Sequence, residues 1–211
     1  MIAVLTAVGA VSCSKENPEG SEDFSNEKKL VKMVGKDENG KDLEVFTFKY
    51  DGKGRLIEST GSFDYGEHSW TSEYVWGDNT IARDGSELPL KDGLIQHPMC
   101  TYNSSNRVIK YDDATIVWDG DKIVSMSSYI GTDLKFIYGE PCKKGYNPLL
   151  TYVMTEYQET FYAHPELIGA RTRQLPIWIG EIYLKYEFDN DGYITKIYIN
   201  QSKHPMVLTW E

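Results

Sequence analysis

The side chains best suited to chemistry in this chain are its three cysteines and four histidines. Cys13 closes an apolar run at the start, whereas Cys100 and Cys142 stand apart in the body of the chain. If the protein is exported, its compartment permits a disulfide between Cys100 and Cys142, and two buried free thiols are the alternative. The sequence around these cysteines does not indicate a catalytic thiol.

The histidines show no metal-site spacing. Zinc sites on helices use pairs such as H-x-x-x-H, and no such pair occurs. His97, His164 and His204 each precede a proline directly, which is typical of loops. We therefore predict no metal and no cofactor, with a zinc site assembled only in three dimensions as the alternative.

Acidic residues gather in short segments such as 119–121 and 189–192. An EF-hand calcium loop needs a glutamate six residues after its glycine, and Tyr198 stands at that position after Gly192. Tight-turn formation explains these segments better, because Asp, Asn and Gly accept the backbone conformations of turns. The motif G-x-S-x-G and the complete P-loop motif G-x-x-x-x-G-K-[ST] are also missing, since Asp42 stands where the P-loop needs Ser or Thr. A hydrolase with two carboxylates stays open, because only their separation in space decides it.

Aromatic side chains offer a different chemistry, the stacking of sugar rings or the lining of an apolar ligand groove. The chain has five Trp, fifteen Tyr and seven Phe. A tryptophan in a β-rich chain is by default part of the core, so exposure has to be argued from its context. Trp70 follows the polar residues 67–69, and Trp178 follows a long loop. We predict these two tryptophans as exposed ligand-binding residues.

The elements that must position these side chains are marked by a repeated phrase. An aromatic residue is followed by Asp, Asn or Gly, a short polar turn, and an aliphatic residue five or six positions after the aromatic. The most complete copy lies within residues 183–199. The five copies begin at Tyr50, Trp76, Tyr102, Trp118 and Phe188, and a sixth, begun at Tyr138, breaks off at Pro141.

Each copy is typical of a β-hairpin with a tight turn. The aromatic and the aliphatic residue should then lie on neighbouring strands, close enough to pair across the ladder. The predicted fold is mainly β: an antiparallel hairpin meander curled into an open barrel or clam-like sheet.

One segment departs from the β pattern. Asn147 and Pro148 suit an N-cap and a first helical position, apolar residues follow at helical spacing, and His164-Pro165 ends the run. We predict one helix over residues 148–162 that plugs the barrel or covers one face of the sheet. Two further strands are the alternative, because the segment also contains β-prone residues.

The start of the chain predicts where the protein is located. Residues 1–13 are apolar but shorter than the roughly 20 residues that span a bilayer, and they suit a secretory signal. The positive residues of a signal are missing, so we expect the true start to lie upstream; a buried N-terminal strand is the alternative. The small residues before Cys13 resemble the lipobox of bacterial lipoproteins, with Ala10 where Leu is more usual. The resemblance implies lipidation of Cys13.

The polar, acidic residues after Cys13 are typical of a flexible tether, and they resemble the surface-export tethers of Bacteroidota-type lipoproteins. The predicted organisation is a signal peptide over 1–12, a lipidated Cys13 and tether over 13–27, and one β-rich domain over 28–211. The domain is long enough for a real core. The net charge of −10 argues against nucleic acid and against anionic lipid surfaces as partners.

The body of the chain carries a second resemblance. The segments YEFDNDGYITKI and YDGKGRLIE, with QLP at 174–176, resemble lipoproteins of unknown function from gut-type Bacteroidota and the YD (Rhs-type) hairpin repeat. This implies a rolled hairpin sheet in the cell envelope, anchored at the outer membrane and facing outward or the periplasm. These families supply no catalytic residues to transfer.

The leading hypothesis is a non-enzymatic module that binds an extracellular ligand, a glycan or another small molecule. A structural or protein-interaction module of an envelope complex is the alternative, and a hydrolase with a carboxylate pair comes third.

Overall fold

The computed structural model describes residue 24 and residues 26–127, 133–151 and 159–211. The predicted signal peptide, Cys13 and most of the predicted tether lie outside these ranges. So does the middle of the predicted helix. Within the described ranges, no helix has both the length and the apolar run that crossing a membrane requires.

The described residues form one antiparallel sheet of sixteen strands. The strands are β1 (Leu30–Lys36), β2 (Asp42–Tyr50), β3 (Leu56–Phe63), β4 (His68–Trp76), β5 (Thr80–Arg83), β6 (Ser86–Lys91), β7 (Leu94–Ile95), β8 (Cys100–Tyr102), β9 (Val108–Tyr111), β10 (Ala114–Asp119), β11 (Lys122–Ser127), β12 (Asp133–Tyr138), β13 (Pro176–Ile179), β14 (Ile182–Phe188), β15 (Ile194–Ile199) and β16 (Met206–Trp210). A short 3-10 turn, η1 (Asp64–Gly66), joins β3 to β4.

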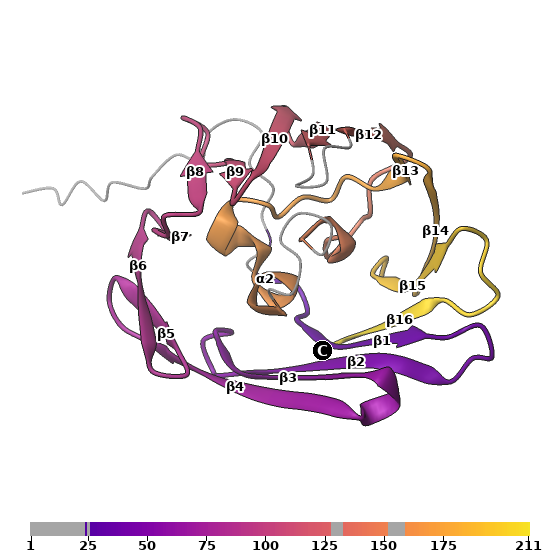
Figure 1. The fold of residues 1–211 in the computed structure, drawn as a ribbon, viewed down its shortest axis with the longest axis horizontal. Helices are drawn as coiled ribbons and strands as arrows, with labels where there is room; N and C mark the ends of the chain where they lie inside the picture. The colour runs from indigo at the N-terminus through magenta and orange to yellow at the C-terminus, as the bar shows by residue number, and fades with distance from the viewer. Residues whose placement is uncertain (1–23, 25, 128–132, 152–158) are drawn as a thin grey trace, which may run out of the picture.

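Each strand pairs with its neighbours in the chain, except at one place, and the first strand pairs with the last. Because β1 pairs with β16, the two chain ends close the sheet into a ring (Figure 1). The exception is the junction between β7 and β8, which are consecutive in the chain but not paired. The result is a nearly closed barrel with one unsealed seam, which confirms the predicted hairpin meander.

The register confirms the hairpin reading of the repeated phrase. In every copy the aromatic residue is the ladder partner of the aliphatic residue that follows it. The pairs are Tyr50 with Leu56, Trp76 with Ile81, Tyr102 with Val108, Trp118 with Ile123 and Phe188 with Ile194. All five aliphatic residues are buried, with exposed fractions of 0–2%. The repeated phrase therefore places one aliphatic side chain of each hairpin in the core.

The turns of these hairpins share one hydrogen-bond pattern. In three of them the side-chain oxygen of the Asp or Asn accepts backbone N–H groups two and four residues ahead. Asp51 accepts from Lys53 and Arg55, Asn103 from Ser105 and Arg107, and Asp189 from Asp191, Gly192 and Tyr193. This is the local bonding that makes Asp and Asn favourable in turns.

Because neighbouring strands alternate in direction, the turns of the repeated phrase all lie at one end of the barrel. We call it the turn end, and it includes the turns at 51–54, 103–106 and 189–192. The opposite end, called the far end, carries η1 and the turn at 84–85. Gly54 and Gly192 adopt positive φ in these turns, at 73° and 95°, a conformation that favours glycine.

Successive hairpins are locked together at the turn end. An aromatic hydroxyl or indole N–H on each of seven even-numbered strands donates to a backbone carbonyl near the start of the strand before it. These bonds run from Tyr50 to Leu30, Trp76 to Leu56, Tyr102 to Ile95, Trp118 to Val108, Tyr138 to Ile123, Tyr186 to Pro176 and Trp210 to Ile194, at 2.6–2.9 Å. In three cases the acceptor is the aliphatic residue of one copy and the donor the aromatic residue of the next.

The chain leaves the sheet after Tyr138, and its described residues 139–151 and 159–175, here called the inner segment, lie inside the barrel (Figure 1). It contains α2 (Glu159–Ala163) and η2 (Pro165–Ile168), and residues 149–151 are also helical. The predicted helix over 148–162 is thus helical at both of its described ends. The sequence signal at Pro141, where the sixth copy breaks off, marks this departure from the sheet.

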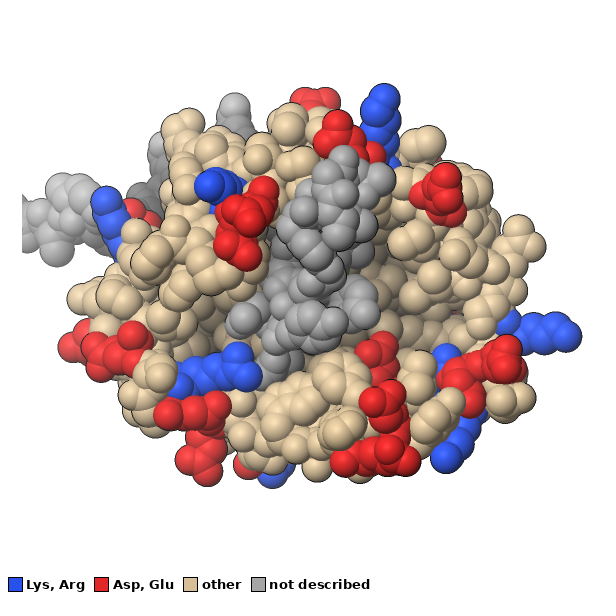
Figure 2. Space-filling model, in the orientation of Figure 1, with Lys and Arg blue, Asp and Glu red and all other residues tan. Residues whose placement is uncertain are grey.

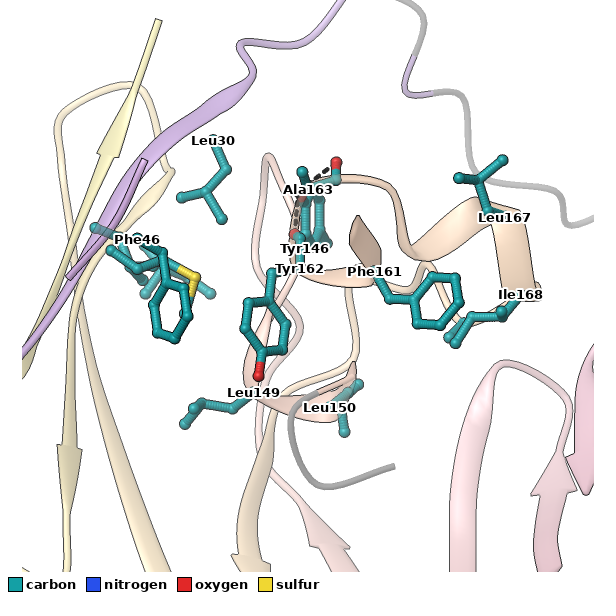
Figure 3. Close-up of a cluster of buried hydrophobic side chains, with 14 of the residues drawn as sticks. Leu30, Phe46, Tyr146, Leu149, Leu150, Phe161, Tyr162, Ala163, Leu167 and Ile168 are labelled. Carbon is teal, nitrogen blue, oxygen red and sulfur yellow. Dashed lines mark hydrogen bonds between the residues drawn. The ribbon is translucent and has the colours of Figure 1, made fainter. Parts of the chain in front are cut away.

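The inner segment supplies much of the hydrophobic core (Figure 3). The ring of Tyr162, 1% exposed, meets Phe46 of β2 edge-on at 5.3 Å between centroids. The hydroxyl of Tyr146 donates to the carbonyls of Tyr162 and Ala163 at 2.7 and 3.0 Å, which holds the two halves of the segment together. Burying this much apolar surface is the main stabilising term of the fold.

Candidate functional site

The wall of the barrel opens where β13 and β14 diverge. These strands pair only at Trp178 with Tyr183 and at Ile179 with Ile182, near the far end. Toward the turn end the bond from the Tyr186 hydroxyl to the Pro176 carbonyl, 2.6 Å long, spans the gap. A cleft remains between the two strands and the start of the inner segment.

The cleft has a volume of about 460 Å³, within the range of small-molecule sites. Its apolar lining includes Ile177, Tyr183 and Phe188, and Phe188 is 46% exposed. Glu140, Lys143, Lys185 and Asp189 bring charge of both signs to its lining. An aromatic surface with a few polar groups around it is the arrangement that recognises a ligand with both apolar and polar faces.

Two polar groups of the cleft are already committed to the fold. Asp189 Oδ1 accepts three backbone N–H groups of its turn, and the Tyr186 hydroxyl donates to Pro176. Burial raises the pKa of Tyr186 well above its usual value, although the hydrogen bond from Asn147 opposes the shift. Tyr186 is therefore a neutral hydrogen-bond donor. Lys143 and Lys185 are the basic residues of the lining, and the Lys185 ammonium lies 5.6 Å from the centroid of the Tyr198 ring on β15.

Trp178, predicted as an exposed ligand-binding residue, lies on the outer face beside this cleft. It is 40% exposed, and its ring meets Tyr183 at 5.1 Å between centroids with the planes tilted by 58°. Its partner on β12 is Ile137, which is 58% exposed, and Ile182 on β14 is 36% exposed. Trp178, Ile137 and Tyr183 form an apolar outer strip that ends at the cleft.

Trp70, the other predicted ligand-binding residue, lies elsewhere. It is half-buried and packs against the core, meeting Phe46 edge-on at 6.1 Å and Phe63 at 5.0 Å. Its ring also covers Gly61, where a Cβ atom would come within 2.1 Å of the indole. Trp70 therefore faces inward from β4, whereas Trp178 faces outward from β13. The structure does not bring the two tryptophans together.

The cysteines of the described chain are free. Cys142 is buried and its thiol donates to the Gly145 carbonyl at 3.5 Å, and Cys100 is half-buried. Burial raises the pKa of Cys100, opposed by a hydrogen bond with Tyr102, so this thiol is held in its protonated form. Within the described ranges, His, Cys, Asp and Glu side chains form no group of three or more that could hold a metal ion.

Sequence reasoning missed a buried polar cluster inside the barrel. His164 Nδ1 lies 2.6 Å from Glu166 Oε1, and His164 Nε2 accepts the Leu56 backbone N–H at 3.0 Å. These bonds assign the proton to Nδ1. Burial would raise the pKa of Glu166, but the hydrogen bond from His164 and the charge of Arg171 lower it to about 2. With both ring nitrogens engaged, His164 ties η2 to β3 and is not poised for proton transfer to a ligand.

The cleft residues on β14 were also missed, although they lie in the best copy of the repeated phrase. Tyr183 and Phe188 fit the strand pattern, and nothing in the sequence marks where β13 and β14 stop pairing. The one local sign is proline at 176, which lacks the N–H that a continued ladder needs.

Comparison with known proteins gives the fold and no family. No protein-family model matches the chain, and no curated protein matches it. Among solved structures, a porin-like protein from Bacteroides uniformis ATCC 8492 superposes with a TM-score of 0.59 at 16% identity, covering 87% of this chain and 98% of that one. A porin-like protein from Bacteroides vulgatus ATCC 8482 gives a TM-score of 0.31 at 13% identity, covering 87% of this chain and 99% of that one. The first likeness shows a shared fold.

Proposed function

We propose that this protein is a non-enzymatic binding module of the bacterial cell envelope, and that it holds a glycan or a similar small ligand at the cleft between β13 and β14. The observation that carries the proposal is the divergence of these two strands, which leaves a cleft of about 460 Å³ in the wall beside exposed aromatic rings. Tyr183 and Phe188 line the cleft, and Trp178 extends its aromatic surface onto the outer face. Sugar rings stack on such surfaces through their apolar faces and leave their hydroxyls to polar neighbours.

The polar side chains around the cleft suit the hydroxyl groups of a sugar. Lys143 and Lys185 each offer several N–H donors, and Glu140 offers carboxylate acceptors. On the face of the molecule that Figure 2 shows, acidic and basic side chains are interspersed around its edge. A ligand held by stacking and hydrogen bonds fits this mixed surface better than a ligand held by charge alone.

The envelope location rests on the predicted lipid anchor at Cys13 and on the fold shared with a protein described as porin-like. The way the chain enters the barrel supports an anchor at the turn end. Glu27 accepts from the Gly145 backbone N–H at 2.7 Å and from Arg173 at 2.6 Å, and the Lys28 ammonium lies 3.0 Å from Asp191. The ten residues 14–23 would span at most about 35 Å, so the turn end would lie within about that distance of the membrane.

The test is a thermal-shift screen of residues 14–211 against a panel of oligosaccharides from plant, host and bacterial surfaces. A ligand that binds the folded state raises Tm with its concentration, by mass action. We expect Trp178→Ala and Lys185→Ala each to reduce the shift. Val75→Ala is the matched control, because Val75 is an outward-facing apolar residue of β4 that is 69% exposed.

A panel without any shift, or a shift that Val75→Ala reduces as much as Trp178→Ala, would refute the proposal. The second candidate is a protein-interaction module, which the outer strip of Ile137, Trp178 and Tyr183 favours. It predicts that Trp178→Ala abolishes capture of an envelope protein while no oligosaccharide shifts Tm.

A further inference from the structure

The seam between β7 and β8 is sealed at one end and open at the other. Near the turn end the Tyr102 hydroxyl of β8 donates to the Ile95 carbonyl of β7 at 2.7 Å. Toward the far end β7 stops at Ile95, and residues 96–99 cross from one side of the seam to the other. The first half of β6 therefore faces β8 without a strand between them.

A cavity of about 370 Å³ occupies this opening. Leu88 of β6 and Ile95 of β7 form one wall, Cys100 and Tyr111 of β8 and β9 form the other, and Phe161 of α2 forms the floor. The ring of Phe161 meets Tyr111 edge-on at 6.1 Å between centroids. The walls thus come from the two strand pairs on either side of the seam, β6–β7 and β8–β9, and the floor comes from α2.

The cavity continues inward. A smaller space of about 40 Å³ shares Leu88, Ile95 and Phe161 with it and ends at Tyr74 and Thr160. The hydroxyls of those two residues bond to each other at 2.8 Å, so the inner end is polar but satisfied. The hydroxyl of Tyr111, a residue that is 9% exposed, makes no hydrogen bond to the other described residues and is not among their fully buried unpaired atoms, so it is open to a ligand in the cavity.

The seam is not prepared to receive another strand. The carbonyl that β7 turns toward the seam, that of Ile95, already accepts from the Tyr102 hydroxyl at 2.7 Å. Such capping protects a sheet edge from strand addition. The opening therefore suits a small molecule better than a peptide.

The charged groups at the mouth are partnered within the protein. Arg83 donates to the Ser72 hydroxyl at 3.2 Å and lies 3.7 Å from Asp84, whose carboxylate accepts the Glu73 backbone N–H at 2.8 Å. The cavity thus combines apolar walls, one unpartnered phenol and a mouth whose charges balance. A charged ligand would lose hydration there without gaining an unpaired partner.

From this geometry we propose that the seam cavity is a second binding site, for a small neutral ligand with an apolar ring body and one hydrogen-bonding group that pairs with Tyr111. The site is separate from the β13–β14 cleft and does not depend on it. The ligand enters through the wall of the barrel and rests on Phe161.

The experiment titrates the full chain with 2-naphthol and with naphthalene, followed by the fluorescence of the ligand. Both probes bind, and Tyr111→Phe weakens 2-naphthol by about fivefold, the loss of one ordinary hydrogen bond, while leaving naphthalene unchanged. Cys100→Trp fills the cavity and abolishes binding of both. Val75→Trp, which adds the same side chain to the outer face of β4, leaves both unchanged.

A second measurement on the unmodified chain decides the matter if Cys100→Trp does not fold. Bound 2-naphthol slows the reaction of Cys100 with N-ethylmaleimide, read by mass spectrometry of the labelled peptides, with buried Cys142 as the internal reference. The proposal is overturned if 2-naphthol does not bind, if a folded Cys100→Trp still binds it, or if the labelling rate of Cys100 is the same with and without it.

Discussion

Gly61 shows how one residue type fixes the packing of a strand. It lies on β3 opposite Trp70 of β4, and the indole occupies the space that a side chain would need. An aromatic ring that covers a glycine on the neighbouring strand compensates for the weak strand preference of glycine. Trp70 is held inward by this contact, and not by its own sequence context.

We predict that Gly61→Ala lowers the free energy of unfolding by about 1–3 kcal/mol, the usual cost of overpacking. The added methyl group displaces Trp70 from its place against Phe63. Chemical denaturation measures the change. Gly52→Ala is the control and should be nearly neutral, because a Cβ at Gly52 meets nothing within 4 Å; equal losses in both variants would contradict the packing argument.

Glu166 makes stability depend on pH. Its Oε2 atom is inaccessible although the side chain as a whole is 38% exposed, and its pKa falls from 4.5 to about 2 in the folded protein. A carboxyl group whose pKa is lower in the folded state stabilises the fold while it is ionised. That contribution is complete above pH 4.5 and is lost as the pH falls toward 2.

Glu166→Gln should therefore lower Tm at pH 7, and the difference from the unmodified protein should shrink as the pH falls from 4.5 to 2. Melting curves across this range provide the measurement. Glu87→Gln, at an exposed position of β6, should show no such convergence. A difference for Glu166→Gln that stays constant with pH would show that its charge does not matter.

At this scale the sequence allowed only part of the site to be predicted. Trp178 was expected to be exposed and is, because it follows a loop and faces outward. Trp70 was chosen on the same kind of reasoning, but its polar neighbours did not reveal the glycine that its ring covers. The burial of one tryptophan depends on the residue across the ladder, which local composition does not contain.

The hairpin is the element that repeats, and the bond between hairpins is what makes the repeat a barrel. The aliphatic residue of one copy buries its side chain and offers its carbonyl to the aromatic residue of the next copy. Val108 and Trp118 show this at 2.7 Å, and so do Leu56 and Trp76, also at 2.7 Å. The aromatic residues therefore carry two roles, a ring for the core and a polar tip for the neighbouring strand.

Trp118→Phe tests this bond. It keeps an aromatic ring in place but removes the indole N–H, so the Val108 carbonyl loses its donor. We expect a loss of about 1–2 kcal/mol in the free energy of unfolding, measured by denaturation. Trp178→Phe, at a position with no such bond, should lose much less, and equal losses would show that ring size alone accounts for the effect.

At the element scale the sequence was most informative. Turn residues and aromatic–aliphatic spacing predicted the hairpins and their register, since both depend on neighbouring residues. Two features were beyond it: the pairing of β1 with β16, which joins residues nearly the whole chain apart, and the shape of the inner segment. The divergence of β13 and β14, which makes the cleft, depends on such long-range packing.

In the whole molecule the first and last strands, β1 and β16, pair with each other, and the unsealed edge lies between β7 and β8. Lys29 and Glu211 exchange backbone hydrogen bonds in both directions, so the ends are adjacent at the turn end. The seam between β7 and β8 carries no strand pairing. We therefore expect the pairing of β1 with β16 to hold the barrel closed, and the fold to tolerate a chain break between β7 and β8.

A circular permutant should follow this rule. Joining Glu211 to the start of the domain by a short linker and opening the chain between His97 and Pro98 should preserve the fold, because no ladder is cut. The comparison is a permutant opened between Gly120 and Asp121, which cuts the β10–β11 hairpin. Tm of the first should lie well above that of the second, and the reverse order would contradict the account of closure.

The central claim is that the cleft beside Trp178 binds a ligand, and tryptophan fluorescence tests it most directly. The unmodified protein and Trp178→Phe are titrated with the same oligosaccharide panel. The account predicts a saturable change in emission for at least one oligosaccharide in the unmodified protein, and its disappearance in the variant. No change with any oligosaccharide, or the same change in both proteins, would contradict it.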